Sequence, residues 1–395
     1  MQRRRYLQVG AVGLTASVGG CSSLYGGFED DEDASTRWAV DLPDALFGPP
    51  SVADGDLLIP TEDGLVSLDG GTGEQRWRLD EQVRDFAVDG QWLFTVVGDD
   101  PVLTGYDRDA LQPRWQADDV GQRFTLESDG LYTAAGDGIR AFDRDGTRRW
   151  HLPDEGGDLP YFRRLDGQLL AQHTLGTGSA QRTGIHLAGL DPVAWHWSFE
   201  DPHTAEALVS RVDQQLIVGQ RRDDSPATVR SIGMDDGSIR WEHETEYEVA
   251  EPVTVGADPV LVSAFGGAAD WTAGLDSATG DALWETDDWN ATVYEVGGAV
   301  IARDSSGTVA GLSPDDGTER WRYEPARSAT VSGSDLMPLT DVLVVTEGDS
   351  VVGLDGGSGA ERWRFDFEVS VDAVVPGEGD LYVVVDGTVR NMVLP

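Results

Sequence analysis

The chain has 395 residues, 39% of them hydrophobic, so it is long enough for one large all-β domain or for two to three ordinary domains. Its 71 acidic residues outnumber its 29 basic residues and give a formal net charge of −42. The apolar fraction argues against global disorder. The charge argues against binding to nucleic acid, which requires an electropositive surface.

The charged residues have an unusual composition. The acids are 49 Asp and 22 Glu, and every basic residue is Arg, because the chain contains no Lys. Exposed charges interact over about 10 Å at ordinary ionic strength and over about 3 Å at molar salt, so concentrated salt relieves the repulsion on such a surface. The composition resembles that of salt-adapted proteins of halophilic archaea. The alternative is an acidic protein of a low-salt organism that binds cations or basic partners.

Residues 1–20 are predicted to form an export signal. Arg3 and Arg4, with Tyr6 and Leu7 just behind them, resemble the twin-arginine motif. The weakly apolar run that follows is too short to span a membrane and is typical of the core of a signal peptide.

The signal-like run ends in Val18-Gly19-Gly20-Cys21, which resembles a lipobox, where a peptidase cuts before a cysteine that carries lipid. Cys21 is the only cysteine in the sequence, so an internal disulfide is excluded. We expect lipid attachment at Cys21; the alternative is a chance cysteine in a poorly ordered N-terminus. Cleavage would remove three arginines and change the net charge from −42 to −45. The small, polar and acidic residues 21–36 predict a flexible tether.

Residues 37–395 contain a repeated phrase that ends in Trp, with Trp-to-Trp spacings of 35 to 46 residues. The better copies are SLDGGTGEQRW (67–77), GYDRDALQPRW (105–115), AFDRDGTRRW (141–150), GMDDGSIRW (233–241), GLDSATGDALW (274–284), GLSPDDGTERW (311–321) and GLDGGSGAERW (353–363). A degenerate copy covers 189–197, and Trp38 precedes them all. Short β-rich segments separated by Asp-Gly or similar turns lie upstream of each copy. Each unit therefore predicts four short strands, which is typical of a propeller blade.

Each position of the phrase has a mechanical role. The Asp accepts backbone N–H groups in the turn after the third strand, the Gly supplies a positive φ, and the Trp opens the outer strand and packs on the neighbouring blade. The structural residues predicted in this way are Asp69, Gly73, Trp77, Trp115, Asp143, Trp150, Trp241, Asp276, Trp284, Trp321, Asp355 and Trp363.

The phrase resembles the pyrroloquinoline-quinone-like (PQQ-like) propeller repeat, [AG]-L-D-x-x-[TS]-G-x-x-x-W. The resemblance covers about 355 residues. The family that it points to includes the bacterial lipoprotein that assists outer-membrane protein assembly. It implies an all-β propeller of four-stranded blades. Relatives usually have eight blades, whereas the Trp-anchored units here number nine, so we expect eight or nine. The C-terminal strands lack a Trp phrase and the N-terminal Trp strand lacks partners, so their pairing is expected to close the propeller.

The resemblance also raises an enzyme hypothesis. Quinoprotein dehydrogenases of this fold hold the quinone between a Trp and a disulfide of adjacent cysteines, and they bind Ca²⁺ through acidic and amide side chains. The single Cys21 excludes that disulfide, and Asn290 and Asn391 are the only asparagines. The Asp-rich turns are short and belong to the repeat, so turn chemistry explains them better than calcium binding. We therefore expect neither PQQ nor calcium, no metal and no catalytic residue.

A binding role remains. In a propeller, the loops joining second to third strands and those joining successive blades share one face, and here they are longest in the middle units. We refer to the face that carries these loops as the connecting-loop face. Arg and Trp are favoured at interface hot spots. The candidate binding residues on this face are His173, His203, Arg221, Arg222, Trp271 and Trp289, and the two tryptophans are expected to be exposed. The alternatives are loop insertions without function or a metal site, against which the irregular His spacing argues.

The sequence thus predicts an exported, lipid-anchored, monomeric propeller that acts as a non-catalytic scaffold on the extracytoplasmic face of the cell membrane. Its partner would be an unidentified cell-surface or membrane protein. The alternatives are a PQQ- or metal-dependent oxidoreductase that uses the central funnel, and a solute-binding or sensory ectodomain.

Overall fold

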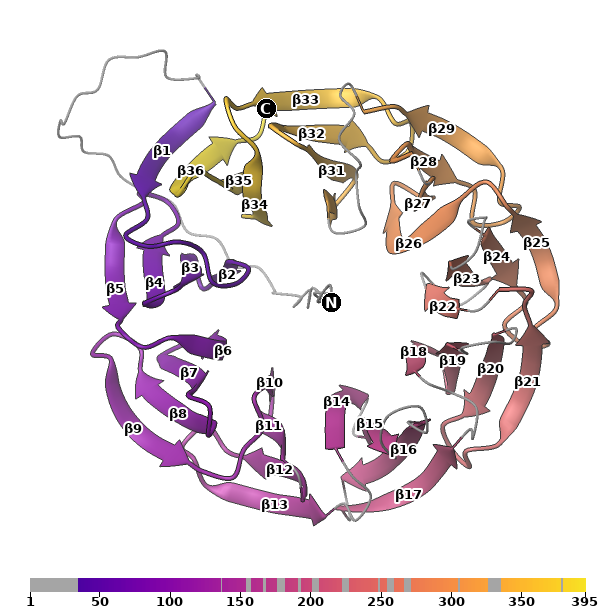
Figure 1. Cartoon of the computed structure of the whole chain (residues 1–395), viewed down its shortest axis with the longest axis horizontal. Helices are drawn as coiled ribbons and strands as arrows, with labels where there is room; N and C mark the ends of the chain where they lie inside the picture. The colour runs from indigo at the N-terminus through magenta and orange to yellow at the C-terminus, as the bar shows by residue number, and fades with distance from the viewer. Residues whose placement is uncertain are drawn as a thin grey trace. The chain divides into compact units, whose positions relative to one another are not determined.

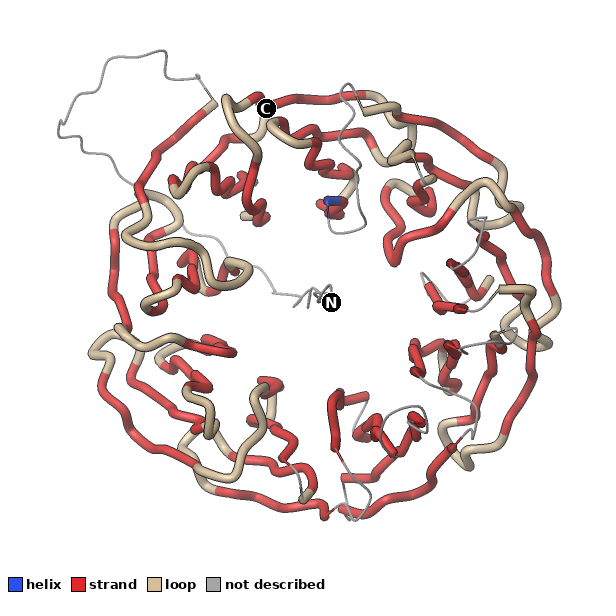
Figure 2. Tube along the Cα trace, viewed as in Figure 1, coloured by secondary structure: helices blue, strands red, loops and turns tan. Residues whose placement is uncertain are grey.

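The computed structural model divides the chain into Met1–Ala34 and Ser35–Pro395, and only the second unit is described. Its described residues are 35–135, 137–153, 158–165, 168–175, 182–190, 193–200, 206–221, 227–247, 249–253, 259–265, 271–304, 306–325, 335–377 and 379–395. Cys21, Arg3 and Arg4 lie outside them. The described residues are nearly all strands and the turns between them (Figure 2).

The described strands form seven four-stranded antiparallel sheets and one eight-stranded sheet, in which β19 and β22 pair at Arg221 and Val249. We divide the eight-stranded sheet into two units and call the resulting nine units blades 1 to 8 and the closing blade (Figure 1). Blade 1 has β2 (Ser51–Ala53), β3 (Asp56–Thr61), β4 (Gly64–Asp69) and β5 (Gln75–Leu79), and blade 2 has β6 (Val83–Asp89), β7 (Trp92–Val97), β8 (Val102–Asp107) and β9 (Gln112–Ala117). Blade 3 has β10 (Phe124–Glu127), β11 (Gly130–Ala135), β12 (Gly138–Phe142) and β13 (Arg148–Pro153). Blade 4 has β14 (Asp158–Leu165), β15 (Gln168–Leu175), β16 (Arg182–Leu190) and β17 (Val193–Glu200). Blade 5 has β18 (Glu206–Val212), β19 (Gln215–Arg221), β20 (Thr228–Gly233) and β21 (Ile239–Glu244), and blade 6 has β22 (Val249–Val253), β23 (Val260–Phe265), β24 (Trp271–Leu275) and β25 (Ala282–Thr286). Blade 7 has β26 (Asn290–Val296), β27 (Ala299–Arg303), β28 (Val309–Leu312) and β29 (Glu319–Tyr323), and blade 8 has β30 (Leu336–Leu339), β31 (Val342–Glu347), β32 (Ser350–Asp355) and β33 (Glu361–Asp366). The closing blade has β34 (Val371–Pro376), β35 (Asp380–Val385), β36 (Thr388–Val393) and β1 (Thr36–Asp41).

The predicted closure is confirmed by the closing blade, whose strand order is β1-β36-β35-β34. β1 pairs antiparallel with β36, and Trp38 lies opposite Asn391. Residues from the two ends of the described chain thus share one sheet. The Trp-anchored count of nine equals the number of units in the described structure.

Hydrophobic clusters lie between consecutive blades. Leu58 and Trp77 of blade 1 pack with Leu93 of blade 2, and equivalent clusters join each later pair of blades. Trp363 of blade 8 packs in one cluster with Leu381 of the closing blade. The closing blade in turn shares a cluster with blade 1. The core is therefore divided among blade junctions, because a sheet buries its apolar face only against a neighbouring sheet.

Candidate functional site

Several repeat tryptophans lie between two glycines. In blade 7, Gly311 of the third strand pairs with Trp321 of the outer strand, and a Cβ on Gly311 would lie 2.2 Å from the ring. A Cβ on Gly359, in the turn of blade 8, would lie 2.6 Å from the other side of the same ring system. The small residue that begins the phrase and the turn glycine of the next blade therefore both make room for the indole. The same arrangement recurs at Trp115 with Gly105 and Gly146, and at Trp284 with Gly274 and Gly317.

In five of the repeat tryptophans the indole N–H donates to a carbonyl of the next blade. Trp321 Nε1 donates to Gly356 O at 2.8 Å, and Trp284 Nε1 donates to Pro314 O at 2.9 Å. Trp38 does the same across the chain closure, donating to Gly70 O at 3.0 Å. A buried indole N–H needs such a partner. The predicted packing of Trp on the neighbouring blade is thus a ring contact together with a hydrogen bond to a turn carbonyl.

Asp69, Asp276 and Asp355 accept turn N–H groups as predicted. In blade 3 the side chain that accepts a turn N–H, from Thr147, is that of Asp145, whereas Asp143 pairs with Arg149. Asp355 Oδ1 accepts the Ser358 N–H at 2.8 Å, and Arg362 donates to Asp355 Oδ2 at 2.5 Å. These contacts, with Arg362 the largest cause, lower the pKa of Asp355 to about 2. Asp69 has the same partners in blade 1, and its pKa is lowered chiefly by Arg76. Carboxylates of this kind lock the turns and are not available as general bases.

Blade 2 departs from the pattern. Its phrase has Leu111 at the place of the turn glycine, and Leu111 adopts a φ of 48°. Trp77 of blade 1 packs in the same cluster as Leu111, and its buried Nε1 has no hydrogen-bond partner among the described residues. The junction between these two blades therefore lacks the hydrogen bond that is made by Trp38, Trp115, Trp241, Trp284 and Trp321.

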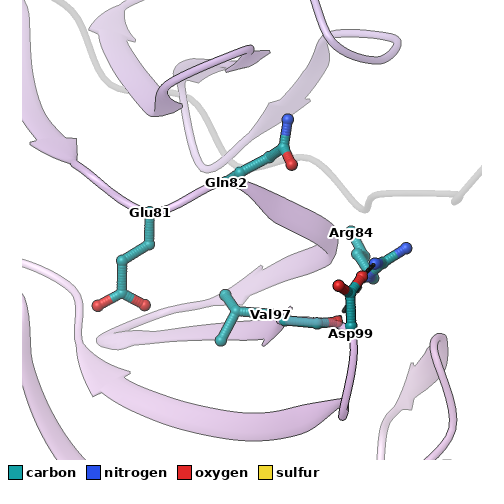
Figure 3. Close-up of a pocket in the computed structure, with 6 residues that line it drawn as sticks. Glu81, Gln82, Arg84, Val97 and Asp99 are labelled. Carbon is teal, nitrogen blue, oxygen red and sulfur yellow. Dashed lines mark hydrogen bonds and ion pairs between the residues drawn. The ribbon is translucent and has the colours of Figure 1, made fainter.

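A groove lies on the connecting-loop face at blade 2, with a cavity volume of about 390 Å³ (Figure 3). It is lined by Glu81, Gln82, Arg84, Val97, Gly98 and Asp99. Residues 81–82 join blade 1 to blade 2, and residues 98–99 follow the second strand of blade 2. These are the two loop classes that the sequence predicted to share a face, and at this blade the structure brings them together.

The groove is polar and held by local hydrogen bonds. Arg84 Nε donates to Gly98 O at 2.6 Å, and the Arg84 guanidinium forms an ion pair with Asp99 (Figure 3). The Tyr106 hydroxyl donates to Glu81 Oε2 at 3.5 Å. Burial and the Glu81 carboxylate raise the pKa of Tyr106, so the phenol keeps its proton. An open groove with one cation and two carboxylates is suited to docking a polar segment.

Two of the predicted binding residues are not on the surface. Trp271 and Trp289 are only 4% and 5% exposed, so the prediction that they are exposed was wrong. Trp271 stacks on Tyr247, and the Arg322 guanidinium lies 5.1 Å from the ring centroid of Trp289. Aromatic residues beside a loop pack into the blade junction because burial of a large ring is favourable wherever the loop brings it near the core.

The other predicted binding residues stand at or beyond the limits of the described structure. His173 lies in β15 and Arg221 ends β19, so their backbones belong to strands. His203 and Arg222 lie outside the described residues. Another histidine, His243 in β21, is partly buried, and its Nδ1 contacts Gly280 O at 3.1 Å.

Sequence reasoning missed the small residue opposite each Trp and the groove at Arg84. The small residue could have been found in the sequence, because Gly, Ala or Ser starts most copies of the phrase. The groove could not, since one Arg at the start of an inner strand does not identify the residues that will lie beside it. Among the described residues, no group of three or more His, Cys, Asp or Glu side chains is arranged to hold a metal ion. No helix in the same part of the chain is long and apolar enough to cross a membrane.

Comparison with solved structures gives the fold. The computationally designed protein Ika8 is 12% identical, with a TM-score of 0.53 over 90% of this chain and 100% of that chain. The quinohemoprotein alcohol dehydrogenase from Comamonas testosteroni is 11% identical, with a TM-score of 0.52 over 91% of this chain and 76% of that chain. BamB from Moraxella catarrhalis is 13% identical, with a TM-score of 0.48 over 91% and 99%.

No curated protein matches the chain. A family model identifies the family, whereas the solved structures show only the fold. The model matches two consecutive stretches of the chain, which together contain most of the repeat phrases. The predicted membership of the PQQ-like propeller group is confirmed. The chain belongs to the family described as outer membrane protein assembly factor BamB, which it matches over residues 29–191 and 187–337.

Proposed function

We propose that this protein is an exported, lipid-anchored propeller that serves as a non-catalytic protein-binding scaffold on the extracytoplasmic face of the cell membrane. The observation that carries the proposal is the open, polar groove of blade 2, where Glu81, Arg84 and Asp99 face solvent on the connecting-loop face. Family membership and the signal-like residues 1–20 ahead of Cys21 support it. The partner is a cell-surface or membrane protein. The assembly role in the family's description is not transferred to this chain.

The groove is suited to protein binding for a physical reason. Its charged groups are already oriented by Gly98 O and Tyr106, so docking orders few additional side chains. Rim charges of this kind steer association and select partners more than they add affinity. We expect added salt to weaken binding at this groove less than it would weaken binding to a single unpaired charge, because Arg84 and Asp99 form an ion pair.

The test is site-specific photo-cross-linking in the native host. A photoreactive residue at Gln82, in the groove, should give one defined cross-linked product. The control is the same residue at Asp315, an exposed position in the turn between β28 and β29. Glu81→Ala with Asp99→Ala should abolish the Gln82 product while leaving thermal unfolding unchanged. Identical products from both positions would contradict a docking role for the groove.

Membrane attachment has a separate test. The mature protein should have the mass of the chain from Cys21 onward plus lipid, and Cys21→Ser should remove the lipid mass and release the protein from membranes. An unprocessed chain with a free Cys21 would contradict the anchor.

The second candidate is an oxidoreductase that uses the central funnel, which the fold likeness to a quinohemoprotein alcohol dehydrogenase favours. The chain does not fit the quinone site stated for such enzymes, because Cys21 is its only cysteine and the repeat tryptophans are committed to blade junctions. Added mass matching a quinone in native mass spectrometry would favour this candidate over the scaffold.

A further inference from the structure

The groove of blade 2 contains a carboxylate that has no cation of its own. Glu81 is exposed and forms no ion pair with any side chain in the described part of the protein. Its Oε2 accepts the Tyr106 hydroxyl at 3.5 Å, which is long beside the roughly 2.7–2.8 Å that is usual for O–H···O bonds. After burial, the charge of Glu81 is the next largest cause that raises the pKa of Tyr106. The negative charge of Glu81 is therefore open to a stronger, positively charged donor.

The groove's own cation is already committed. Arg84 donates to Gly98 O at 2.6 Å and forms an ion pair with Asp99, so these two charges neutralise each other. Val97 is partly exposed, and its side chain lies between the Glu81 carboxylate and the Arg84–Asp99 pair (Figure 3). Within the described structure the groove thus has an apolar middle, a neutral ion pair at one end and an unpaired negative charge at the other.

The segments around the groove are acidic. Residues 78–84 and 97–100 hold four carboxylates and two arginines, a net charge of −2. Arg78 is shared between Asp80 and Asp44, so it neutralises only one of them. Asp100 is exposed next to the groove. Charge complementarity therefore favours a positively charged partner segment at this place.

Two other occupants fit the groove less well. A second copy of the chain has the same formal net charge of −42 and would be repelled as a whole. An acidic segment would bring its carboxylates against Glu81 and Asp99, and like charges in contact suppress binding. The cavity volume of about 390 Å³ lies near the lower end of the roughly 300–1,000 Å³ of ligand pockets. It has room for one long side chain and not for a folded element.

We propose that the groove binds an Arg or Lys side chain of the partner protein, with the methylene stem along Val97 and the positively charged head at Glu81. This inference rests on the proposed scaffold function and names the chemistry of its partner. Long basic side chains bury their stems on apolar surface while the head stays in water, which matches a partly exposed valine beside an exposed carboxylate. Hydrogen bonds between a cation and a carboxylate are about twice as strong as neutral ones, so the new head outcompetes the long contact from Tyr106.

The experiment is a titration of the isotope-labelled mature protein, in detergent micelles, with capped tripeptides and NMR detection. The probes are acetyl-Gly-Arg-Gly-amide, its Lys counterpart and its citrulline counterpart, which is a neutral analogue of the Arg probe. The Arg and Lys probes should shift the backbone amide signals of Gln82, Gly98 and Asp99 in a saturable way, and the citrulline probe should not. Equal shifts with citrulline, or no shift with any probe, would overturn the proposal.

Two variants assign the binding to Glu81. Glu81→Gln keeps the size of the side chain and removes its charge, so it should weaken binding of the Arg probe about fivefold, the upper end of what an exposed ion pair contributes. Asp315→Asn, in the exposed turn between β28 and β29, is the matched control and should bind as the wild type does. Both variants should keep the wild-type Tm. Equal weakening in the two variants would show a general effect of charge and would refute the site.

The cross-linked partner separates this inference from the proposed function. Peptide mapping of the product captured at Gln82 should place the cross-link beside an Arg or Lys of the partner. A product captured through a neutral or acidic stretch would overturn this inference and leave the scaffold function standing. Absence of any product would instead contradict the scaffold function itself.

Discussion

Gly359 satisfies two independent requirements at one residue. Its φ of 68° lies in the left-handed region, and the Trp321 ring occupies the space that a Cβ would need. Gly387 has a similar φ of 73° but open space around it. Substitutions at these two glycines therefore distinguish the cost of backbone strain from the cost of steric overlap with the Trp321 ring.

We expect Gly359→Ala to destabilise the protein by about 2–4 kcal/mol, as left-handed strain and overpacking act together. Gly387→Ala should cost only about 1–2 kcal/mol, from strain alone. Thermal unfolding at fixed salt measures both. Equal losses would show that the Trp contact adds nothing.

Asp85 is a titratable group in an unusual setting. It lies in β6, accepts the Phe124 N–H of β10 at 2.9 Å, and so joins the inner strands of blades 2 and 3. Burial raises the pKa of Asp85 to about 6, against the smaller opposing effects of the Phe124 N–H and Arg123.

A carboxyl whose pKa is raised on folding stabilises the native state when protonated, so its contribution is lost as pH rises from about 4 through 6. Asp85→Asn cannot ionise and should be more stable than the wild type at pH 7 by about 1–2 kcal/mol. The two proteins should converge near pH 4. Unfolding curves across this pH range at constant salt provide the measurement, and parallel curves would refute the expectation.

At the scale of the element, the outer strand of each blade is held by its tryptophan. Trp321 has both the ring contact with Gly359 and the hydrogen bond to Gly356 O, whereas Trp77 has the packing without the hydrogen bond. The two side chains are 6% and 7% exposed, so they are matched in burial.

Trp321→Phe leaves the Gly356 carbonyl unsatisfied and should cost about 1–3 kcal/mol more than Trp77→Phe, which loses no hydrogen bond. Both variants lose similar apolar area, so the difference isolates the indole N–H. Chemical unfolding of the two variants side by side gives the comparison. A larger loss at Trp77 would contradict the assigned role of the hydrogen bond.

The elements themselves were largely predictable. The sequence predicted four short strands for each unit, and in the first unit these are β2, β3, β4 and β5. Turn Asp and Gly residues act locally, so their roles follow from the phrase. The exposure of Trp271 and Trp289 was mispredicted because burial depends on the neighbouring blade, which the local sequence does not describe.

At the scale of the whole molecule, β1 is the strand on which closure depends. It pairs with β36, and Arg37 binds Asp380 across 343 positions of the chain. Without β1, the edge of β36 would be left open, and an open edge invites pairing with another strand.

Deletion of residues 35–41 should lower Tm and promote aggregation. A synthetic peptide of residues 35–42 should bind the truncated chain and restore the original Tm, whereas a scrambled peptide should not. Unaltered unfolding of the truncated chain would contradict the closure role of β1.

The sequence by itself determined the blade architecture, the turn chemistry, the closure by the terminal strands and the excess of negative charge, because each follows from local periodicity or from simple counting. The tertiary structure decided what depends on contacts between blades: the groove at Arg84, the burial of Trp271, and the hydrogen bond that Trp321 makes to Gly356 O. The physical reason is that a repeat specifies its own strands, whereas the environment of a side chain at a junction is supplied by the next blade. Gly70 illustrates this, since a Cβ there would lie 2.4 Å from the hydroxyl oxygen of Tyr382, more than three hundred positions away in the sequence.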